Sequence, residues 1–591
     1  NLLNICYIYP RKLKFTSFEL KFMSFELNNP NINTKKPIEF ELVKGRKNII
    51  RKSDKLIKGE GRAQIGSSKS FVSHLDKLPF VDRTLVDYKK YHKYVGHAGR
   101  KNFMAIQATR GCPYKCFYCD IYKTTVIHYR RSVNNIIEEC KMISDLGIRR
   151  IEFIDDIFNV NIKHCSDFFE KIIKSKLDFE FMFPTGLKGD LLTKDLIDLM
   201  FEGGTRGMNL SLEHPSPRLQ KVMRKGLDVE KFKENIQYIT LKYPEIVVGM
   251  NTMHGFPTET EEEAYMTLNF IKDIKWIHFP YMFNVRVFPG TELEHFALES
   301  GVPKELIENT QDMSYEEGSP TIPFSRDFTK AMKTIFLRDY VLSKERLLHI
   351  LPYQMKLFSE NELDQKYNAY FPSKINSLND LLKVAKIKRS ELKVQDCLSE
   401  EEIKIPNIST KLEKYFPKKR VSDNALKVLL IDLSTHYIKE EDHREYNVVE
   451  PPLGLMALIS YINNTSLGEQ INFKIIKSFI DFNSHEELVD CIKKFSPDLL
   501  GFRTMTFYKN FFHDAIAHIR KMQIKTPIIV GGPYPTASYI DVMKDENVDL
   551  AVIAEGEITF SEILEKMLKN NNKFPLPSEL ATIDGVVFRK N

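Results

Sequence analysis

The hydrophobic and polar positions between residues 100 and 300 change their period repeatedly. Short apolar segments alternate with longer segments in which apolar residues recur about every three to four positions. The first kind predicts strands and the second predicts amphipathic helices. The expected strands are 102–109, 149–156, 178–186, 207–213, 246–255 and 279–290, and the expected helices are 132–147, 162–175, 193–202, 229–240 and 260–273. These six β/α repeats predict a parallel sheet, which right-handed crossovers would curl into a full or partial barrel.

A second series of the same kind occupies the C-terminal part of the chain. Its expected strands are 426–434, 471–479, 498–505, 527–532 and 550–556, and its expected helices follow 451–454, cover 484–494 and 510–522, and include a short one before 550. This alternation predicts a doubly wound, Rossmann-like sheet that binds ligands at the carboxyl ends of its strands. Between the two series, a polar and mainly helical extension is expected, with breaks at Pro352, Pro372, Pro406 and Pro417.

These patterns give an α/β chain in four parts. They are a basic N-terminal extension and linker (1–72), the barrel (73–320), a helical extension with a linker (321–425) and the Rossmann-like domain (426–591). A length of 591 residues agrees with two or three domains.

Composition and charge narrow the class of protein. With 42% hydrophobic and 28% charged residues, the chain has the composition of a globular protein, and no apolar run reaches the roughly 18–20 residues of a membrane helix. Residues 1–60 hold 13 Lys/Arg against 6 Asp/Glu, a balance that equals the whole net charge of +7. The rest of the chain is therefore neutral, which argues against a nucleic-acid partner and gives no sign of a membrane. The start of the chain lacks signal-peptide features, and few cysteines are present, so a reducing cytoplasm is expected.

Three of the 8 cysteines crowd into one short loop, "ATRGCPYKCFYCD" (108–120), at Cys112, Cys116 and Cys119. A structural zinc site usually needs four ligands in spaced pairs, and no second Cys/His pair follows at a matching distance. Cys140 and Cys165 fall in predicted helices and are expected to be buried. Three thiolates fit an iron–sulfur cubane better, because three ligands leave one of its four irons open for another molecule. The loop follows a predicted strand, which places this centre at the mouth of the barrel.

The C-x3-C-x2-C loop, with Tyr118 just before its last cysteine, resembles the signature of radical S-adenosylmethionine (SAM) enzymes. The resemblance implies a 4Fe-4S cluster on Cys112, Cys116 and Cys119, whose open iron binds the amino and carboxylate groups of SAM. It also implies that an electron from the cluster cleaves SAM to methionine and a 5′-deoxyadenosyl radical. The main chain around Tyr118 would then lie near the adenine.

Other segments extend this resemblance over roughly residues 75–305. "IEFIDDIFNVN" (151–161) is similar to the second-strand segment that reaches the SAM amino group, which nominates Asp155 and Asp156, although paired acids at a strand end could equally cap the next helix. "MNLSLEHPSP" (208–217) nominates Glu213 for the SAM ribose, with a surface ion pair as the alternative. Relatives commonly carry Arg where this chain has Lys188, which offers a point charge without a bidentate fork. "GFPTETEEEAYMTLNFI" (255–271) and "FPGTELEHFALESG" (288–301) resemble the closing part of the barrel.

The C-terminal domain resembles the cobalamin (B12) binding domain of B12-dependent radical SAM enzymes. The segments that carry the likeness are "PPLGLMALISYI" (451–462), "GFRTMTF" (501–507), "GGPYPTA" (531–537) and "AEGEITFSEIL" (554–564). The resemblance implies cobalamin contacts at Leu453, Gly454, Thr504, Met505, Gly531, Gly532, Glu555 and Gly556, with the corrin over the 453–455 and 504–507 loops. No D-x-H-x-x-G motif offers a lower ligand to cobalt, and Tyr534 stands where the family frequently has His. A Rossmann-like scaffold without cobalamin stays open as the alternative.

Together the resemblances imply a cobalamin-dependent radical SAM methyltransferase that acts on an unactivated carbon. A radical SAM oxidoreductase or cyclase without methylcobalamin and a non-catalytic iron–sulfur or cobalamin-binding module are the alternatives. The expected partners are an external electron donor of the flavodoxin or ferredoxin type and a small-molecule or peptide substrate. Relatives place the cobalamin domain before the barrel, so the reversed order and the missing initiator Met predict a slice through a tandem or rearranged gene, with a second barrel beyond Asn591.

Overall fold

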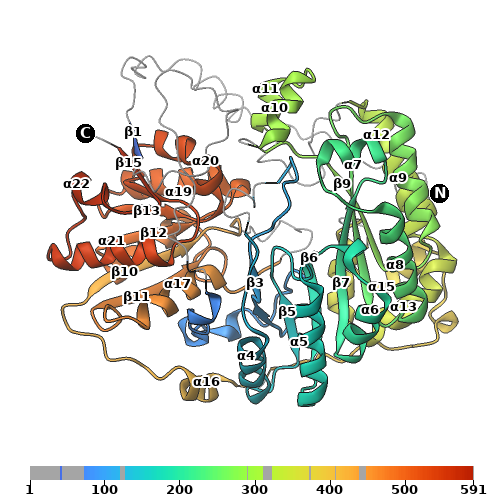
Figure 1. Cartoon of the computed structure of the whole chain (residues 1–591), viewed down its shortest axis with the longest axis horizontal. Coiled ribbons are helices and arrows are strands. Elements are labelled where there is room, and N and C mark those ends of the chain that lie inside the picture. The colour runs from blue at the N-terminus through green and yellow to red at the C-terminus, as the bar shows by residue number, and fades with distance from the viewer. Residues whose placement is uncertain are drawn as a thin grey trace.

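Two large sheets, each flanked by helices, lie at the centres of the two halves of the molecule (Figure 1), with the barrel in teal and green and the C-terminal sheet in orange and red. The computed structural model describes residues 40–42, 72, 74–119, 121, 127–288, 291–309, 323–371, 375–405, 407–437 and 448–589. Of the sequence predictions, Pro372, Pro406 and all of the extension 1–72 except 40–42 and 72 lie outside this description. In the described part of the chain, no helix is both long and apolar enough to cross a membrane.

The first sheet has six parallel strands in the order β2-β5-β6-β7-β8-β9. Their bounds are β2 Met104–Ile106, β5 Arg150–Phe153, β6 Glu180–Leu187, β7 Thr205–Glu213, β8 Val247–His254 and β9 Phe279–Asn284. Within the described residues β2 and β9 are the two edges of this sheet, so the barrel is partial. The six predicted strands are confirmed, and the predicted parallel order is confirmed with them.

The helices that connect these strands begin where side chains can cap them. Ser132, Asn161, Thr193, Asp228 and Thr260 each accept a hydrogen bond from a backbone N–H of the first turn. The helices are α4 Val133–Asp145, α5 Ile162–Ser175, α6 Lys194–Glu202, α7 Pro217–Met223, α8 Val229–Lys242, α9 Glu261–Asp273, α10 Glu292–Glu299 and α11 Lys304–Asn309. The apolar faces of α4, α5, α6, α8 and α9 pack on the sheet in one core, while α7, α10 and α11 pack in a second, smaller cluster. The sequence pattern did not predict α7.

The middle of the chain is helical, as predicted, and it packs on the barrel. Its helices are α12 Arg326–Ile335, the π-helix η6 Phe336–Val341, α13 Lys344–Leu357, α14 Glu360–Asn368, α15 Leu378–Val384 and α16 Ser409–Tyr415. The predicted break at Pro352 is wrong, because α13 runs through it and buries the proline beside Ile350 and Leu351. Arg346 of α13 donates to the carbonyls of Ile277 and His278 at the start of β9, which fixes the helix to the sheet.

The second sheet contains five parallel strands in the order β14-β13-β12-β10-β11. They are β10 Leu426–Asp432, β11 Ile471–Lys477, β12 Leu499–Arg503, β13 Ile528–Gly531 and β14 Leu550–Val552, connected by α17 Leu453–Asn463, α18 His485–Phe495, α19 Lys509–Lys521 and α20 Pro533–Lys544. After α21 Glu557–Lys569 and α22 Pro577–Leu580, β15 Val586–Arg589 adds an antiparallel edge, and β1 Phe40–Leu42 from the N-terminal segment pairs with it. The strand order reverses between β10 and β12, which is where ligands bind in doubly wound folds.

The two sheets are joined by a segment that precedes the barrel. The Asp82 N–H donates to the Ser460 hydroxyl of α17 across 2.8 Å, while the guanidinium of the next residue, Arg83, donates to the Ala105 carbonyl of β2. A β-bridge joins Val95 to Val448, and the His97 N–H donates to Glu450. These bonds place the carboxyl ends of the C-terminal strands against the β2 edge of the barrel.

Candidate functional site

The cysteine loop leaves β2 at the carboxyl edge of the barrel. A short antiparallel ladder between β3 Thr109–Arg110 and β4 Tyr129–Arg130 closes its base. Cys112, Cys116 and Cys119 are half-buried and free of disulfides, and the Cys119 N–H donates to the Cys116 carbonyl. Cys140 and Cys165 are buried in α4 and α5, as predicted.

The chemistry of the three thiols fits an iron–sulfur cluster better than a single ion. Among the residues that the structure describes, no three His, Cys, Asp or Glu side chains converge on a position for one metal ion. Burial raises the pKa of Cys112 to about 11 and also raises that of Cys116, although the positive charge of Lys225 opposes both shifts. Thiols held in this way ionise when a metal centre replaces their protons. A cluster, which spaces its ligands more widely than one ion does, suits such a loop.

Phe117 anchors the loop between two of the cysteines. Its ring is buried at 4% exposure and packs edge-on against Phe296 and beside Phe256. The Phe117 N–H donates to the Met223 carbonyl, and its own carbonyl accepts from the N–H of Leu293. Sequence reasoning missed this residue, although an aromatic between two closely spaced cysteines was a visible signal.

Asp155 and Asp156 follow β5 and hold the backbone on both sides of the first turn of the loop. Oδ1 of Asp155 accepts from the N–H groups of Ala108 and Thr109 and, at 2.6 Å, from the Thr109 hydroxyl. Oδ2 of Asp156 accepts from the Gly111 N–H at 3.0 Å. Burial raises the pKa of both acids, that of Asp155 to about 7. The acids do not cap α5, whose N-cap is Asn161, so they hold the cysteine loop; their contact with SAM stays a prediction.

Glu213 ends β7 beside the cysteine loop, in the left-handed region with a φ of 64°. Its Oε1 accepts from the Lys225 ammonium at 2.7 Å and from the Tyr118 hydroxyl at 3.3 Å. Glu213 and Lys225 are both buried, so this is no surface ion pair. Burial and the Glu213 charge raise the pKa of Tyr118. Since both bonds use Oε1, the other carboxylate oxygen can accept from a ligand, as the predicted ribose contact requires.

Lys188 also lies against the cysteine loop. Its ammonium donates to Asp190 and to the Gly226 carbonyl, and it lies 5.2 Å from the ring centre of Tyr114. Just before it, Gly186 has a φ of 70°, and a Cβ there would fall 2.3 Å from the Asp155 carbonyl oxygen. This close approach brings the end of β6 against the acids that hold the loop.

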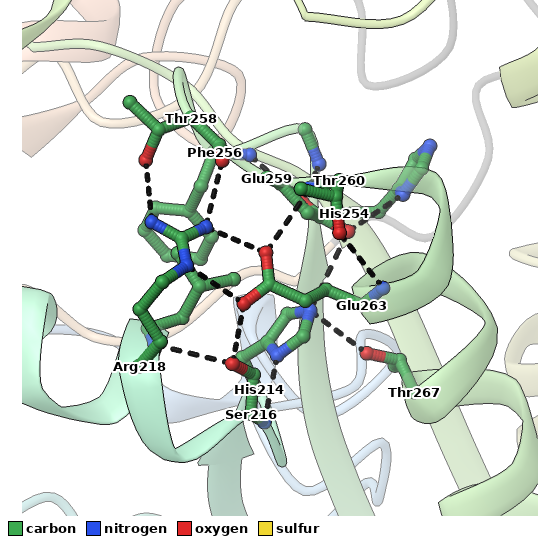
Figure 2. Close-up of polar contacts among 12 residues, drawn as sticks. His214, Ser216, Arg218, His254, Phe256, Thr258, Glu259, Thr260, Glu263 and Thr267 are labelled. Carbon is green, nitrogen blue, oxygen red and sulfur yellow. Dashed lines mark hydrogen bonds and ion pairs between the residues drawn. The ribbon is translucent and has the colours of Figure 1, made fainter.

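Glu259 ties together the ends of β7 and β8 (Figure 2). Its Oε1 lies 3.4 Å from Nε2 of His214 and 3.3 Å from Nδ1 of His254, while Oε2 accepts from the N–H groups of Gly255 and Phe256. Although burial opposes ionisation, the hydrogen bonds from the two histidines lower the pKa of Glu259 to about 2. The buried carboxylate therefore stays charged and fixes His214, the residue that follows Glu213.

Glu263 forms the neighbouring half of the same network. It accepts from the Ser216 hydroxyl at 2.6 Å and from two nitrogens of Arg218, and it completes a capping box with Thr260 at the start of α9. Arg218 also donates to the Thr258 carbonyl, so the turn that carries Thr258 is held from α7. Glu259 and Glu263 of the "TETEEE" segment thus position the ends of β7 and β8. The sequence analysis did not predict this role.

A cavity of about 380 Å³ lies between the C-terminal sheet and the β2 edge of the barrel. One wall comes from the strand ends and helix starts of the C-terminal domain, and the other from the cysteine-loop side of the barrel and the segment before it. The first wall includes Leu453, Gly454, Gly501, Arg503, Gly531, Gly532, Glu555, Gly556 and Glu557; the second includes Leu75, Leu78, Pro79, Phe80, Val81, Gln107, Arg110 and Arg131. The structure therefore brings six of the eight predicted cobalamin residues together.

Two glycines of this cavity, Gly454 and Gly531, leave room for a large group against the backbone. A Cβ on Gly454 would meet nothing nearer than Arg503 Nε at 4.0 Å, and one on Gly531 nothing nearer than Val552 at 3.9 Å. The helices α17 and α21 begin there without a side-chain cap, which leaves N–H groups of their first turns for a ligand. These open walls fit a bulky cofactor with a polar tail, as cobalamin would be.

Two of the predicted cobalamin residues, Thr504 and Met505, are absent from the cavity lining. Thr504 is fully buried, and its carbonyl accepts from the Tyr534 N–H. Tyr534 itself lies in the domain core, where its hydroxyl bonds to His513 at 3.0 Å and to Asp541 at 3.1 Å. The loop after Met505 points toward the barrel instead, where Phe507 packs edge-on against Phe288 at 5.0 Å.

Comparison with known proteins agrees with both halves of this site. The Radical SAM superfamily model matches residues 106–271, and the B12 binding domain model matches residues 445–564. The chain is 26% identical over 304 residues to the uncharacterized methyltransferase PH0819 of Pyrococcus horikoshii, covering 49% of this chain and 63% of that protein. It is 27% identical over 248 residues to the tRNA-2-methylthio-N(6)-dimethylallyladenosine synthase of Aquifex aeolicus, covering 40% of this chain and 53% of that protein. The chain thus spans less than two thirds of the length of these relatives.

Solved structures show partial similarity. The radical SAM methyltransferase TsrM from Kitasatospora setae, with cobalamin and a [4Fe-4S] cluster bound, matches at a TM-score of 0.30 and 20% identity, over 33% of this chain and 39% of that chain. The cobalamin-dependent radical SAM enzyme OxsB, with aqua-cobalamin and SAM bound, matches at a TM-score of 0.33 and 14% identity, over 53% of each.

Proposed function

Because this chain joins a radical SAM domain to a C-terminal B12-binding domain, we propose that it is a cobalamin-dependent radical SAM enzyme that transfers a methyl group to an unactivated carbon. The two families imply a 4Fe-4S cluster, SAM and cobalamin as cofactors. When bound, the cluster supplies the electron that cleaves SAM, and cobalamin supplies a methyl group. An external one-electron donor of the flavodoxin or ferredoxin type would reduce the cluster.

The residues of the barrel edge perform the positioning that this chemistry needs. Cys112, Cys116 and Cys119 would hold the cluster on a loop that Asp156 fixes to the end of β5 and Phe117 fixes to α7 and α10. Glu213, already oriented by Lys225, would accept from the ribose hydroxyls of SAM. Such preorganisation reduces the reorganisation that binding and reaction require.

The observation that carries the proposal is that the cavity of the C-terminal domain opens onto the cysteine-loop side of the barrel. Gln107 and Arg110, which lie within five residues of Cys112, line the same cavity as Gly454 and Gly531. Cobalamin held there would lie beside the cluster loop, and it would be covered by apolar residues of the segment that precedes the barrel. A shared and covered site of this kind excludes water from reactive intermediates.

The proposal is tested with the full chain, purified and reconstituted without oxygen. Iron and sulfide reconstitution should give cluster absorption, and SAM with a reductant should then give 5′-deoxyadenosine. Hydroxocobalamin should bind, and mass spectrometry of a cell extract incubated with the enzyme should find products heavier by one CH2 group. Cleavage of SAM without bound cobalamin would instead support the oxidoreductase or cyclase reading, and a cluster without cleavage would leave only a binding module.

A further inference from the structure

Arg110 belongs to both halves of the site. It lies two residues before Cys112, and its side chain, 12% exposed, lines the cavity. Its Nη1 donates to Glu557 at 2.6 Å and to Glu555 at 3.1 Å, and both acids belong to the C-terminal domain. Its Nε donates to Gln107 at 3.1 Å, so the guanidinium is oriented from its own side as well.

The other arginines of the cavity are bound within their own half of the molecule. Arg83 and Arg131 both donate to Glu139 of the barrel, and Arg503 donates to Asp432 of its own sheet. Among the cavity arginines in the part of the chain that the structure describes, only Arg110 pairs with carboxylates across the junction of the two domains.

The surroundings of Arg110 make this link stiff. Its neighbours Thr109 and Gly111 are held through their N–H groups by Asp155 and Asp156, so the guanidinium cannot shift far without moving the cysteine loop. On the other side, Glu557 is the first residue of α21, and its side chain is 5% exposed. Two carboxylates therefore meet one buried cation, an arrangement that any ligand touching Glu555 or Arg110 must alter.

We propose that Arg110 is a positioning residue that couples the two cofactor sites, so that a corrinoid in the cavity and a cluster on the cysteine loop change each other's binding. This inference rests on the proposed function and adds a specific regulation to it. Coupling of this kind is reciprocal, because the same free energy enters both binding equilibria. Occupation of the cavity would move Glu555 and Glu557 relative to Arg110, and the stiff backbone would transmit that change to Cys112.

The test measures the dissociation constant of hydroxocobalamin for the full chain in two forms, with the cluster reconstituted and after its removal by a chelator. For the unchanged protein the two constants should differ by about fivefold or more. In Arg110→Gln the ratio should fall to about one, and Arg110→Lys should restore part of it because the charge returns without the fork. Glu557→Gln, which alters the other partner, should also reduce the ratio.

Lys90→Gln is the matched control, because Lys90 forms an ion pair with Asp481 across the same domain junction but does not line the cavity. It should leave the ratio as in the unchanged protein. A second readout is the electron paramagnetic resonance spectrum of the reduced cluster, which hydroxocobalamin should shift in the unchanged protein and not in Arg110→Gln.

Equal dissociation constants in the two forms of the unchanged protein would overturn the coupling and leave the proposed cofactors intact. An unchanged ratio in both Arg110→Gln and Glu557→Gln would overturn the role of Arg110. If hydroxocobalamin bound neither form, the coupling and the cobalamin part of the proposed function would both be overturned.

Discussion

The N–H of Gly111 donates to Oδ2 of Asp156 across 3.0 Å, and this bond joins the residue before Cys112 to the end of β5. Replacing Asp156 with Ala removes the acceptor and frees the turn that presents the first cysteine. Outer partners of metal ligands are worth about tenfold or more in metal affinity, so Asp156→Ala should lose iron about tenfold more readily than the unchanged chain. Iron and sulfide per chain, measured during chelator challenge, check this. Asp167→Ala, which breaks an exposed ion pair with Lys163, should behave as the unchanged protein.

Cys116→Ala should abolish the visible absorption of the reconstituted protein, because two thiolates cannot hold the cubane that three were predicted to hold. Cys140→Ala is the control, since that thiol is buried in α4 and can only affect packing. Metal analysis distinguishes an iron–sulfur cluster from a zinc site. Zinc retained at one ion per chain, with no iron, would contradict the cluster.

Glu213→Gln should weaken SAM binding while the cluster stays intact. The neutral amide loses its charge-assisted bond with Lys225, which orients the side chain. The ribose loses a charged acceptor worth about 1.5–3 kcal/mol, or about a tenfold or greater rise in Kd. Equilibrium dialysis with SAM and cluster-loaded protein measures this. Glu292→Gln, which removes a half-exposed pair with Arg224, provides the comparison for a surface ion pair. Equal SAM affinity in both variants would show that Glu213 does not touch the cofactor.

A size series at Gly454 tests the cavity directly. Gly454→Ala adds a Cβ with no neighbour nearer than 4.0 Å and should bind hydroxocobalamin nearly as well as the unchanged protein. Gly454→Leu fills the space and should weaken binding by at least about tenfold, while cluster content and thermal stability change little. Undiminished hydroxocobalamin binding by Gly454→Leu would show that the corrinoid does not occupy the space beside Gly454.

We expect the protein to lose stability at acid pH when Glu259 becomes protonated. Its pKa is about 2 in the folded protein against an ordinary 4.5, so the ionised form stabilises the fold fully above pH 4.5. That contribution, about 3 kcal/mol, is lost as the pH falls from about 4.5 to about 2. Glu259→Gln should be less stable at neutral pH and should lack this part of the pH dependence. Denaturant unfolding at several pH values measures both effects, and parallel curves for the two proteins would contradict them.

The local patterns of the sequence predicted more of the fold than of the site. Strands such as Val247–His254 and helices such as Val133–Asp145 follow from periodicity and caps, because those signals lie within the segment itself. Pro352 was wrongly predicted to end a helix, since burial of α13 against the barrel stabilises it despite the missing N–H. Tertiary packing, not local sequence, decided that outcome.

For the site, a match to short motifs located the cysteines and most of the glycines, but not the contacts between distant segments. The pairing of Arg110 with Glu557 joins residues 447 positions apart, and no local pattern encodes it. Thr504 was predicted to contact cobalamin because its segment resembles the B12-binding family, yet its side chain is buried within the domain. Which way a loop residue faces depends on neighbours such as Tyr534, which only the folded chain brings near.

The wall of the cavity formed by Leu75, Phe80 and Val81 has a consequence for biogenesis. Gly531 and Glu555, on the facing wall, are synthesised more than 400 positions after these residues. The chamber is therefore completed only when the strand ends of the C-terminal domain have been made. Capture of a corrinoid has to wait for both walls, and a cell that makes the two halves as separate pieces would have to dock them before either could retain it.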